Sequence, residues 1–508
     1  MKPKYIVVQA GGRGSRLEYL TNNKPKALVP VGNLPMIFHL FRKYPESIFI
    51  IIGDYKYDVL EKYLDIFAEI DYLMVDASGT QGTCSGLKKA LSYIPENEQL
   101  MLIWSDLLLD VNFSLPQYNK NYIGISKTFY CRWSYNCGEF KEIKSNEHGV
   151  AGLFIFKNKN EIKNVPYEGE FVRWLATQDI SFNEVALNNS KEIGLLLEYE
   201  KIPKSKCRPF NSITIDDDKI IKKGINSQGE SLAIRECAWY KKVKELNISN
   251  IPHIYQTSPL VMEKIEGKNM YECQFSYERK CRILNSLIEC LLNLHKMGKI
   301  ESSKDSYYEA YIGKTYDRLE KVKTLIPFAD KESFVVNGKK CINPFFVRSR
   351  LEEIIMHYFP KEFVFLHGDC TFSNLMIKDG DIPVMIDPRG YFGTTELYGD
   401  AAYDWAKLYY SIVGNYDQFN LKRFKLLINE NDVTLNIESN GWEEMEPVFF
   451  DFIKEKVNQK QIKVIHAIIW LSLTTYAWED YDSICGAFYN GSFLLTQVME
   501  EIESAGIL

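Results

Sequence analysis

The sequence lacks several features that mark particular classes of protein. Its 61 Lys and Arg residues face 67 Asp and Glu, so the net charge of −6 leaves no basic excess for binding nucleic acid. Its 11 cysteines form no CxxC pair and have no histidine at zinc-ligand spacing, and the N-terminus has no signal-peptide pattern. We therefore expect reduced thiols, a cytoplasmic location and no nucleic-acid partner.

Long apolar runs, internal repeats and low-complexity segments are also missing. The most apolar stretch, Val464–Trp478, contains His466 and is shorter than the roughly 20 residues that cross a bilayer. This stretch predicts a buried helix rather than a membrane span. With 508 residues and 46% hydrophobic side chains, the chain predicts several packed domains.

The first part of the chain alternates short apolar runs with helical patterns. Tyr5–Gln9, Ile48–Ile52 and Leu100–Trp104 are predicted as strands buried on both faces, and Tyr122–Ser126 and Val150–Lys157 as further strands. The alternation favours an α/β fold with a doubly wound parallel sheet. Ligands of such a sheet lie beyond the carboxyl ends of its strands.

A change of pattern near Lys204 predicts a domain boundary. The segment 201–209 contains two prolines and three lysines, and a new alternating pattern follows it. We expect one domain over residues 1–204 and a second over 205–508. The second would have a small β-rich lobe over about 205–266 and a larger helical lobe over about 267–508.

A glycine-rich loop follows the first predicted strand. Gly11, Gly12 and Gly14 allow backbone N–H groups to approach a polyphosphate, and Arg16 and Lys26 supply positive charge for its oxygens. No Gly-Lys-Ser/Thr follows, so this is not a Walker A loop. The residues alone predict phosphate binding.

The run GGRGSRLEYLTNNKPKALVPVGNLPMI, residues 11–37, resembles the opening of the nucleotidyltransferases that make nucleotide-activated sugars and CDP-choline. This resemblance implies a Rossmann-like domain in which the three glycines hold a nucleoside triphosphate and Arg16 and Lys26 are catalytic. It also implies that Gly82 and Thr83 face the base and that Asp106 binds Mg²⁺.

The acceptor of this first domain stays open. Gly169–Val172 looks like phosphocholine cytidylyltransferases, whereas Gln81–Leu87 looks like sugar-phosphate enzymes. A second acidic ligand for the metal is expected in this part of the chain. Glu170 is a candidate, but Arg173 stands where an acid is expected. CTP is the favoured nucleotide.

A second group of polar residues follows predicted strands near the C-terminal third. His367-Gly368-Asp369 is followed by Asn374, and Asp387 ends the next strand. Phosphoryl transfer needs such a set, with one carboxylate for the hydroxyl and two groups for the metal.

These residues resemble the aminoglycoside phosphotransferase and choline kinase family, which has a two-lobed protein-kinase-like fold. The resemblance implies that Asp369 is the catalytic base and that Asn374 and Asp387 hold the Mg²⁺ of ATP. A protein kinase would carry DFG where this chain has Asp-Pro-Arg, which favours a small-molecule acceptor.

The small lobe is expected to provide the other ATP contacts. Lys222 and Glu236 fit the lysine and helix glutamate of a kinase, although Lys223 is an alternative to Lys222. The backbone at Glu263 and Ile265 is predicted to hold adenine.

Two further groups of residues carry predictions for the second domain. Asp400 and Asp404 are expected to brace the catalytic loop, or simply to begin a helix. Aromatic residues near the C-terminus suit a choline-like acceptor or, more simply, a core. They are Trp405, Tyr409, Trp470, Tyr476 and Trp478, with acids at Glu479, Asp480 and Asp482.

Together the halves predict a bifunctional enzyme. The kinase would phosphorylate a small alcohol, either a sugar or a choline-like molecule, with ATP. The nucleotidyltransferase would then activate the phosphate for a surface polysaccharide or lipid. Two alternatives are an enzyme specific for CDP-choline and a nucleotide-binding regulatory protein with one inactive half.

Overall fold

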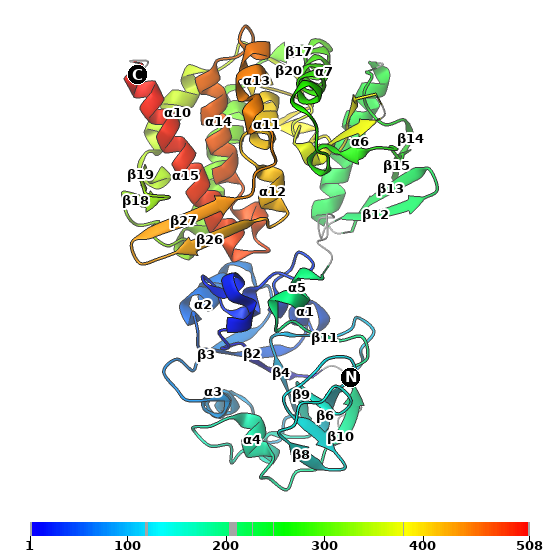
Figure 1. Cartoon of the computed structure of the whole chain (residues 1–508), viewed down its shortest axis with the longest axis vertical. Coiled ribbons are helices and arrows are strands. Elements are labelled where there is room, and N and C mark those ends of the chain that lie inside the picture. The colour runs from blue at the N-terminus through cyan, green and yellow to red at the C-terminus, as the bar shows by residue number, and fades with distance from the viewer. Residues whose placement is uncertain are drawn as a thin grey trace. The chain divides into compact units, whose positions relative to one another are not determined.

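The computed structural model describes residues 3–116, 120–202, 211–225, 227–246, 248–378 and 380–505. The chain divides into two compact units (Figure 1). The first extends to Lys204 and includes the short segment Glu479–Asp482, and the second contains the rest. The expected boundary at Lys204, and most of the segment 201–209, lie outside the described residues.

The first unit is built on one mixed sheet with the strand order β10-β6-β9-β4-β1-β2-β3. The bounds of these strands are β1 Tyr5–Gln9, β2 Ile48–Gly53, β3 Tyr72–Asp76, β4 Leu100–Trp104, β6 Tyr122–Ser126, β9 Gly149–Phe156 and β10 Asn183–Ala186. β1 pairs in parallel with β2 and β4, as expected, but β9 is antiparallel to β4 and β6. The strand predicted over Val150–Lys157, which corresponds to β9, therefore makes the sheet mixed. This strand is reached through the hairpin β7–β8 (Ser134–Asn136 and Glu139–Lys141), and antiparallel neighbours need no crossover helix.

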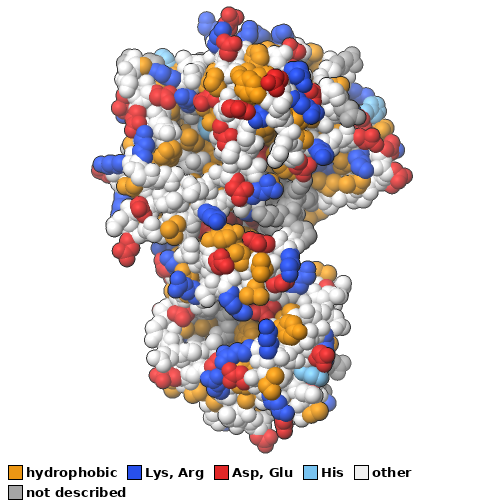
Figure 2. Space-filling model, viewed as in Figure 1, with side chains coloured by type: hydrophobic (Ala, Val, Ile, Leu, Met, Phe, Trp, Pro, Cys, Tyr) orange, Lys and Arg blue, Asp and Glu red, His pale blue; other side chains and the backbone are white. Residues whose placement is uncertain are grey.

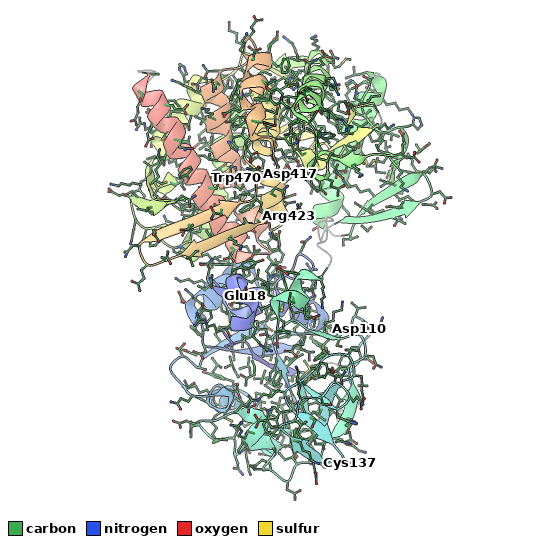
Figure 3. The ribbon with its side chains drawn as sticks, in the orientation of Figure 1. Glu18, Asp110, Cys137, Asp417, Arg423 and Trp470 are labelled. Carbon is green, nitrogen blue, oxygen red and sulfur yellow. The ribbon has the colours of Figure 1, made fainter. Side chains whose placement is uncertain are left out.

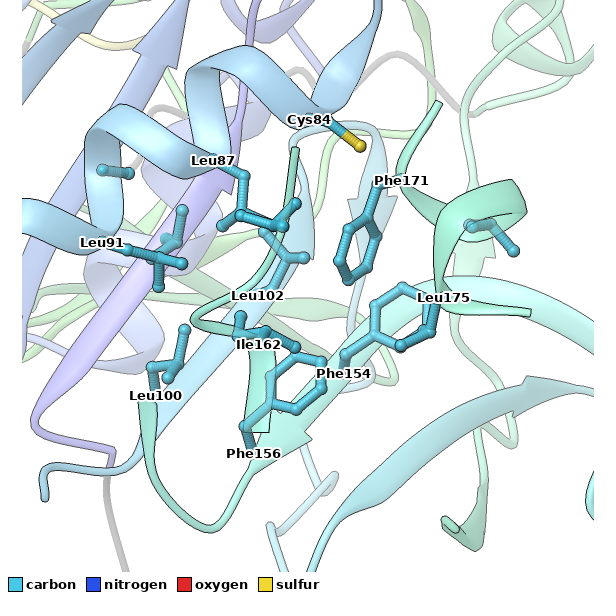
Figure 4. Packing of buried hydrophobic residues seen from close by; sticks show 14 of the residues in the cluster. Cys84, Leu87, Leu91, Leu100, Leu102, Phe154, Phe156, Ile162, Phe171 and Leu175 are labelled. Carbon is cyan, nitrogen blue, oxygen red and sulfur yellow. The ribbon is translucent and has the colours of Figure 1, made fainter. Parts of the chain in front are cut away.

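The core of the first unit explains why its central strands are apolar throughout. Ile6, Val7 and Val8 of β1 are fully buried, as expected for a strand covered on both faces. Figure 4 shows side chains of β4 and β9 packed with those of two helices, α3 and α4. The helices of this unit are α1 Met36–Lys43, α2 Tyr57–Phe67, α3 Thr83–Ala90, α4 Phe171–Leu175 and α5 Leu196–Glu200.

The second unit begins with a small lobe made of an antiparallel sheet and one helix. The sheet has the order β12-β13-β15-β14, and α6 covers Ser227–Glu245. Its strands are β12 Asn211–Asp216, β13 Lys219–Gly224, β14 Ile254–Thr257 and β15 Leu260–Glu263. Four antiparallel strands and one helix thus open the second unit, and its division into two kinase-like lobes stays a prediction.

The larger lobe contains more strand than the sequence predicted. Its helices are α7 Tyr277–Lys296, α8 Lys304–Tyr308, α9 Lys314–Val322, α10 Arg348–His357, α11 Ala401–Ile412, α12 Tyr416–Asn420, α13 Glu446–Ile453, α14 Gln459–Ser472 and α15 Tyr481–Ser504. Three larger sheets lie among them, with the orders β16-β21-β22, β17-β20-β25 and β19-β18-β27-β26. The strands of the first two sheets are β16 Lys268–Asn269, β21 Leu375–Lys378, β22 Ile382–Met385, β17 Lys299–Glu301, β20 Glu362–Phe365 and β25 Tyr398–Gly399. The last contains β18 Ser333–Val336, β19 Lys339–Ile342, β26 Phe424–Ile428 and β27 Asp432–Ile437. The simple description as a helical lobe is therefore incomplete, because short strands of this kind have little periodic signal.

The predicted apolar helix Val464–Trp478 lies in α14 only as far as Ser472, and its residues from Val464 to Ser472 are buried. A separate 3₁₀ turn, Thr475–Ala477, follows. No helix among the described residues combines the length and apolar character needed to cross a bilayer. On the face shown in Figure 2, basic and acidic side chains are interspersed, in keeping with the nearly balanced charge.

Candidate functional site

The glycine-rich loop connects β1 to a 3₁₀ turn, Ser15–Thr21. Gly14 has a φ of +67°, and a Cβ on Gly11 would lie 2.8 Å from the Cβ of Asp54. The fold itself therefore favours glycine at both positions. A Cβ on Gly12, in contrast, would meet nothing within 4 Å, so this glycine leaves open space above the loop.

Lys26 and Asp106 form a buried ion pair beside this loop. Lys26 lies in the 3₁₀ turn Lys26–Leu28, and Asp106 follows the end of β4. Two charges removed from water need each other as partners. The structure thus brings together two of the predicted site residues from segments 80 positions apart.

Glu192 joins this pair and was missed by the sequence reasoning. It lies in β11 (Lys191–Glu192), which pairs with β5 (Leu107–Leu108) directly after Asp106. Burial and the negative charge of Asp106 raise the pKa of Glu192, and Arg16 Nη2 lies 4.0 Å from its Oε1. A two-residue strand has no periodicity that would reveal it.

Glu170, the residue considered earlier as a second metal ligand, has other neighbours. Its Oε2 lies 3.9 Å from Arg132 Nη1. Burial, and to a smaller extent the charge of Glu170, raises the pKa of Cys84. Arg173 pairs with Glu142 at 2.8 Å. Glu192, rather than Glu170, therefore shares the surroundings of Asp106.

The turn at Gly82 and Thr83 begins α3 and is fixed by contacts on two sides. Gly82 has a φ of +81°, and a Cβ there would lie 2.3 Å from Gly169 O. Thr83 Oγ1 accepts from Phe171 N at 2.8 Å, and Thr83 O accepts from Gln9 Nε2 at 3.2 Å. Since Gln9 ends β1, the turn lies at the same sheet edge as the glycine-rich loop.

In the second unit, Lys222 of β13 lies between two carboxylates. Its Nζ is 2.9 Å from Glu236 Oε2 and 2.9 Å from Asp387 Oδ1. Burial alone would lower the pKa of Lys222, but Asp387 and Glu236 outweigh it and raise this pKa. Burial also raises the pKa of Glu236 to about 7. Lys223 is exposed, so Lys222 is the lysine that the structure places against these acids.

Asp369 lies in the loop after β20 (Glu362–Phe365), beside Asn374 and a lysine that the sequence did not single out. Asn374 Nδ2 donates to Asp369 Oδ2 at 2.9 Å, and Lys407 Nζ lies 2.9 Å from Asp369 Oδ1. Burial would raise the pKa of Asp369, but Lys407 outweighs it and this pKa is lowered. Lys407 lies in α11, where one lysine in a helix carries no functional signal by itself.

Two buried aspartates hold this loop. Asp404 accepts from the backbone N–H of His367 at 3.0 Å and of Gly368 at 2.7 Å. Asp417, labelled on α12 in Figure 3, accepts from Ser373 N at 2.8 Å. Asp400 instead caps α11 by accepting from Ala402 N at 3.0 Å. Asp404 therefore braces the loop, and Asp400 begins a helix.

The backbone of Glu263 is partly engaged already. Its N–H donates to His253 O at 2.8 Å, and its carboxylate lies 2.9 Å from Lys378 Nζ. Because this N–H already donates to His253 O, it does not take part in the expected contact with adenine. The side chain of Ile265, the other predicted residue, is buried.

The C-terminal aromatic residues include true core residues. Trp405 and Trp470 are 1% and 0% exposed, and Trp470, labelled in Figure 3, donates from Nε1 to His466 Nε2 at 3.0 Å. Side chains so deeply packed do not form an open acceptor site. The simpler of the two interpretations, a core, holds for these two residues.

The known proteins that are similar to this chain match residues of its first unit. Residues 5–123 match the family described as nucleotidyl transferase. The first unit contains a nucleotidyltransferase domain. D-glycero-alpha-D-manno-heptose 1-phosphate guanylyltransferase from Campylobacter jejuni is 25% identical over 210 residues, covering 40% of this chain and 89% of that protein.

Two solved structures are also similar to part of the chain. HddC from Yersinia pseudotuberculosis is 20% identical, with a TM-score of 0.34, over 39% of this chain and 97% of its own. The CTP:phosphocholine cytidylyltransferase LicC from Streptococcus pneumoniae is 21% identical, with a TM-score of 0.31, over 40% of this chain and 97% of its own. None of these likenesses extends over more than 40% of the chain.

The residues of the nucleotidyltransferase domain suit a magnesium ion that arrives with its nucleotide. Asp106 and Glu192 offer carboxylate oxygens, which Mg²⁺ prefers. Across the described residues, no three His, Cys, Asp or Glu side chains form a group that would hold a metal ion. Mg²⁺ commonly completes such a site with water and substrate phosphates.

Proposed function

We propose that this protein is a bifunctional enzyme with a nucleotidyltransferase site in the first unit and a small-molecule kinase site in the second. The kinase would phosphorylate a small alcohol, a sugar or a choline-like molecule, using ATP. The nucleotidyltransferase would then transfer a nucleotidyl group, with CTP favoured, to the phosphate. The product would be an activated headgroup for a surface polysaccharide or lipid.

The nucleotidyltransferase site is supported by the convergence of Lys26, Asp106 and Glu192 beside the glycine-rich loop. Lys26 and Arg16 would bind the triphosphate, while Gly12 leaves room for it to approach the backbone. Asp106 and Glu192 would hold Mg²⁺, which supplies positive charge to the phosphate oxygens. The acceptor phosphate would attack the α-phosphorus and displace pyrophosphate.

The kinase site is carried by one observation, the meeting of Lys222 with Glu236 and Asp387. Lys222 comes from the small lobe and Asp387 from the larger lobe, so both lobes contribute to one charged site. Lys222 would bind ATP phosphates, and Asn374 and Asp387 would hold Mg²⁺. Asp369, kept ionised by Lys407, would accept the proton of the attacking hydroxyl.

The chemistry of the two halves supports their coupling. A kinase acting on an alcohol makes a phosphate ester, and a nucleotidyltransferase uses such an ester as acceptor. The relative from Campylobacter jejuni is named for a sugar 1-phosphate, which supports a sugar phosphate as the intermediate. Residues 169–172 support choline phosphate as the second candidate, with CDP-choline as its product.

A mass-spectrometric screen tests both activities in the full-length protein. The protein would be incubated with Mg²⁺, ATP and each other nucleoside triphosphate against sugars, polyols, choline and ethanolamine. We expect an alcohol phosphate and a nucleotide-linked product. Asp369→Asn should abolish both from the free alcohol, yet it should retain nucleotidyl transfer to the ready-made phosphate.

Asp106→Asn is the matched counterpart of that variant. It should accumulate the alcohol phosphate without nucleotide-linked product. If the protein binds nucleotides but turns over neither alcohols nor phosphate esters, the catalytic proposal is wrong and a regulatory nucleotide-binding role replaces it.

A further inference from the structure

A cluster of basic side chains lies around the ring of Tyr403, on α11 of the second unit. The ring centroid is 5.8 Å from Lys314 Nζ, 5.8 Å from Lys407 Nζ and 6.0 Å from Arg389 Cζ. Because Lys407 also pairs with Asp369, the cluster adjoins the residue proposed as the catalytic base.

The guanidinium groups of the cluster contact neutral partners. Arg389 donates to the hydroxyl oxygens of Tyr403 at 2.8 Å and Tyr391 at 2.9 Å. Arg318, one turn after Lys314 on α9, donates to Ser472 O at 2.6 Å. These contacts position the side chains without cancelling their charge.

The negative charge nearby is too small to balance the cluster. Among the described residues, no carboxylate lies within 4.0 Å of the basic nitrogens of Lys314, Arg318 or Arg389, and Asp369 is already paired with Lys407. Glu309 offsets Lys314 only partly. Burial, followed by the charges of Arg389, Arg318 and Lys407, lowers the pKa of Lys314 well below its usual range.

This arrangement differs from that of Lys222. The charge of Lys222 is opposed by Glu236 and Asp387, which suits a lysine that exchanges these acids for ATP phosphates. Clustered cations in a partly buried site instead favour an anionic ligand, because the ligand supplies the missing negative charge. A cation such as choline would be repelled there.

We propose that the alcohol phosphorylated by the second unit carries its own carboxylate or phosphate group, which Lys314, Arg318 and Arg389 bind while its hydroxyl faces Asp369. This inference rests on the proposed kinase function. In the reaction, the hydroxyl oxygen forms a bond to the γ-phosphorus of ATP, the bond to the bridging oxygen breaks, ADP leaves, and Asp369 takes the proton.

Matched acceptors test the charge requirement. With full-length protein, Mg²⁺ and ATP alone, ADP release would be measured for D-glycerate, glycerol 3-phosphate and glycerol, then for gluconate, sorbitol and choline. We expect kcat/KM to be at least about tenfold higher for an anionic acceptor than for its neutral counterpart. The carboxylate and phosphate members show which anion is bound.

Lys314→Gln tests whether the basic cluster binds the anionic group of the acceptor. Lys361→Gln, at an exposed position, is the control. Lys314→Gln should lower kcat/KM for the anionic acceptor by about tenfold or more and leave the KM for ATP unchanged, whereas the control should change neither. Rescue by Lys314→Arg would separate loss of charge from loss of packing.

The other outcomes overturn the inference in different ways. Preference for neutral or cationic alcohols, unaffected by Lys314→Gln, would leave the kinase standing and refute the anionic acceptor. A raised KM for ATP in Lys314→Gln would assign the cluster to the nucleotide. No ADP release with any alcohol would refute the kinase function itself.

Discussion

The two candidate sites use a buried or largely buried lysine in different ways. In the first unit, Lys26 pairs with Asp106, while Glu192 lies close by with a raised pKa. In the second unit, Lys222 is shared by Glu236 and Asp387. In both, the acids that hold the lysine are also residues suited to the site chemistry, so substrate binding must exchange one set of charge pairs for another.

The sites also differ in what surrounds the lysine. The first lies at one sheet edge, with Arg16 exposed to solvent. The second combines the carboxylate-rich surroundings of Lys222 with the basic cluster around Tyr403. The candidate site of the first unit therefore gathers its charges at one sheet edge, while that of the second unit has two groups of opposite character, one for each proposed substrate.

The largest effect that would test this comparison of the two sites is expected at Lys222. Lys222→Met should lower kinase kcat/KM by about a hundredfold or more, because it removes a charge aimed at the phosphates and leaves the buried Glu236 and the partly exposed Asp387 without this cation. Lys223→Met, at the exposed neighbour, should have little effect. ADP release measures both variants, and equal losses would contradict the assignment to Lys222.

The role of Glu192 is the next test. Glu192→Gln should lower nucleotidyl transfer to a ready-made phosphate by roughly tenfold to a hundredfold, because it removes a carboxylate beside Asp106. Glu170→Gln is the matched control and should retain most activity. Pyrophosphate release measures this step. A larger loss in the Glu170 variant would move the second acid of the site away from Glu192.

The pH dependence of the kinase tests the pairing of Lys407 with Asp369. Lys407 holds the pKa of Asp369 below its ordinary value, so the base stays ionised as the pH falls. In Lys407→Met, the largest influence that opposes burial is removed, so the pKa of Asp369 rises and activity should be lost at a higher pH than in the wild type. kcat/KM measured against pH gives the shift. An unchanged acid limb would show that Lys407 does not control this carboxyl group.

Substitutions at two glycines of the first unit distinguish an effect on stability from an effect on nucleotide binding. Gly82→Ala should destabilise the protein by about 1–3 kcal/mol, because a Cβ would meet Gly169 O and the backbone has a φ of +81°. Gly12→Ala should leave thermal stability nearly unchanged and weaken nucleotide binding. Thermal melts and nucleotide titrations distinguish the effects, and destabilisation by Gly12→Ala would show that this glycine also serves the fold.

Much of the first unit could be predicted from the sequence. β1, β4 and β6 have the predicted bounds, because each is a short apolar run between clear breaks. The direction of β9 could not be predicted, since a strand has the same alternation whichever way it runs. Glu192 could not be predicted because its strand is two residues long, and only the pairing of this strand with β5 places Glu192 beside Asp106.

The sequence by itself determined the features that depend on neighbouring residues: the glycine-rich loop, the buried central strands and the Asp369–Asn374 spacing. Only the tertiary structure decided between Lys222 and Lys223, because the deciding contact, with Asp387, spans 165 positions. It likewise brought Lys314, Arg389 and Lys407 around Tyr403. Electrostatic interactions depend on distance in space, so residues without a shared local pattern acquire a common role only when the chain folds.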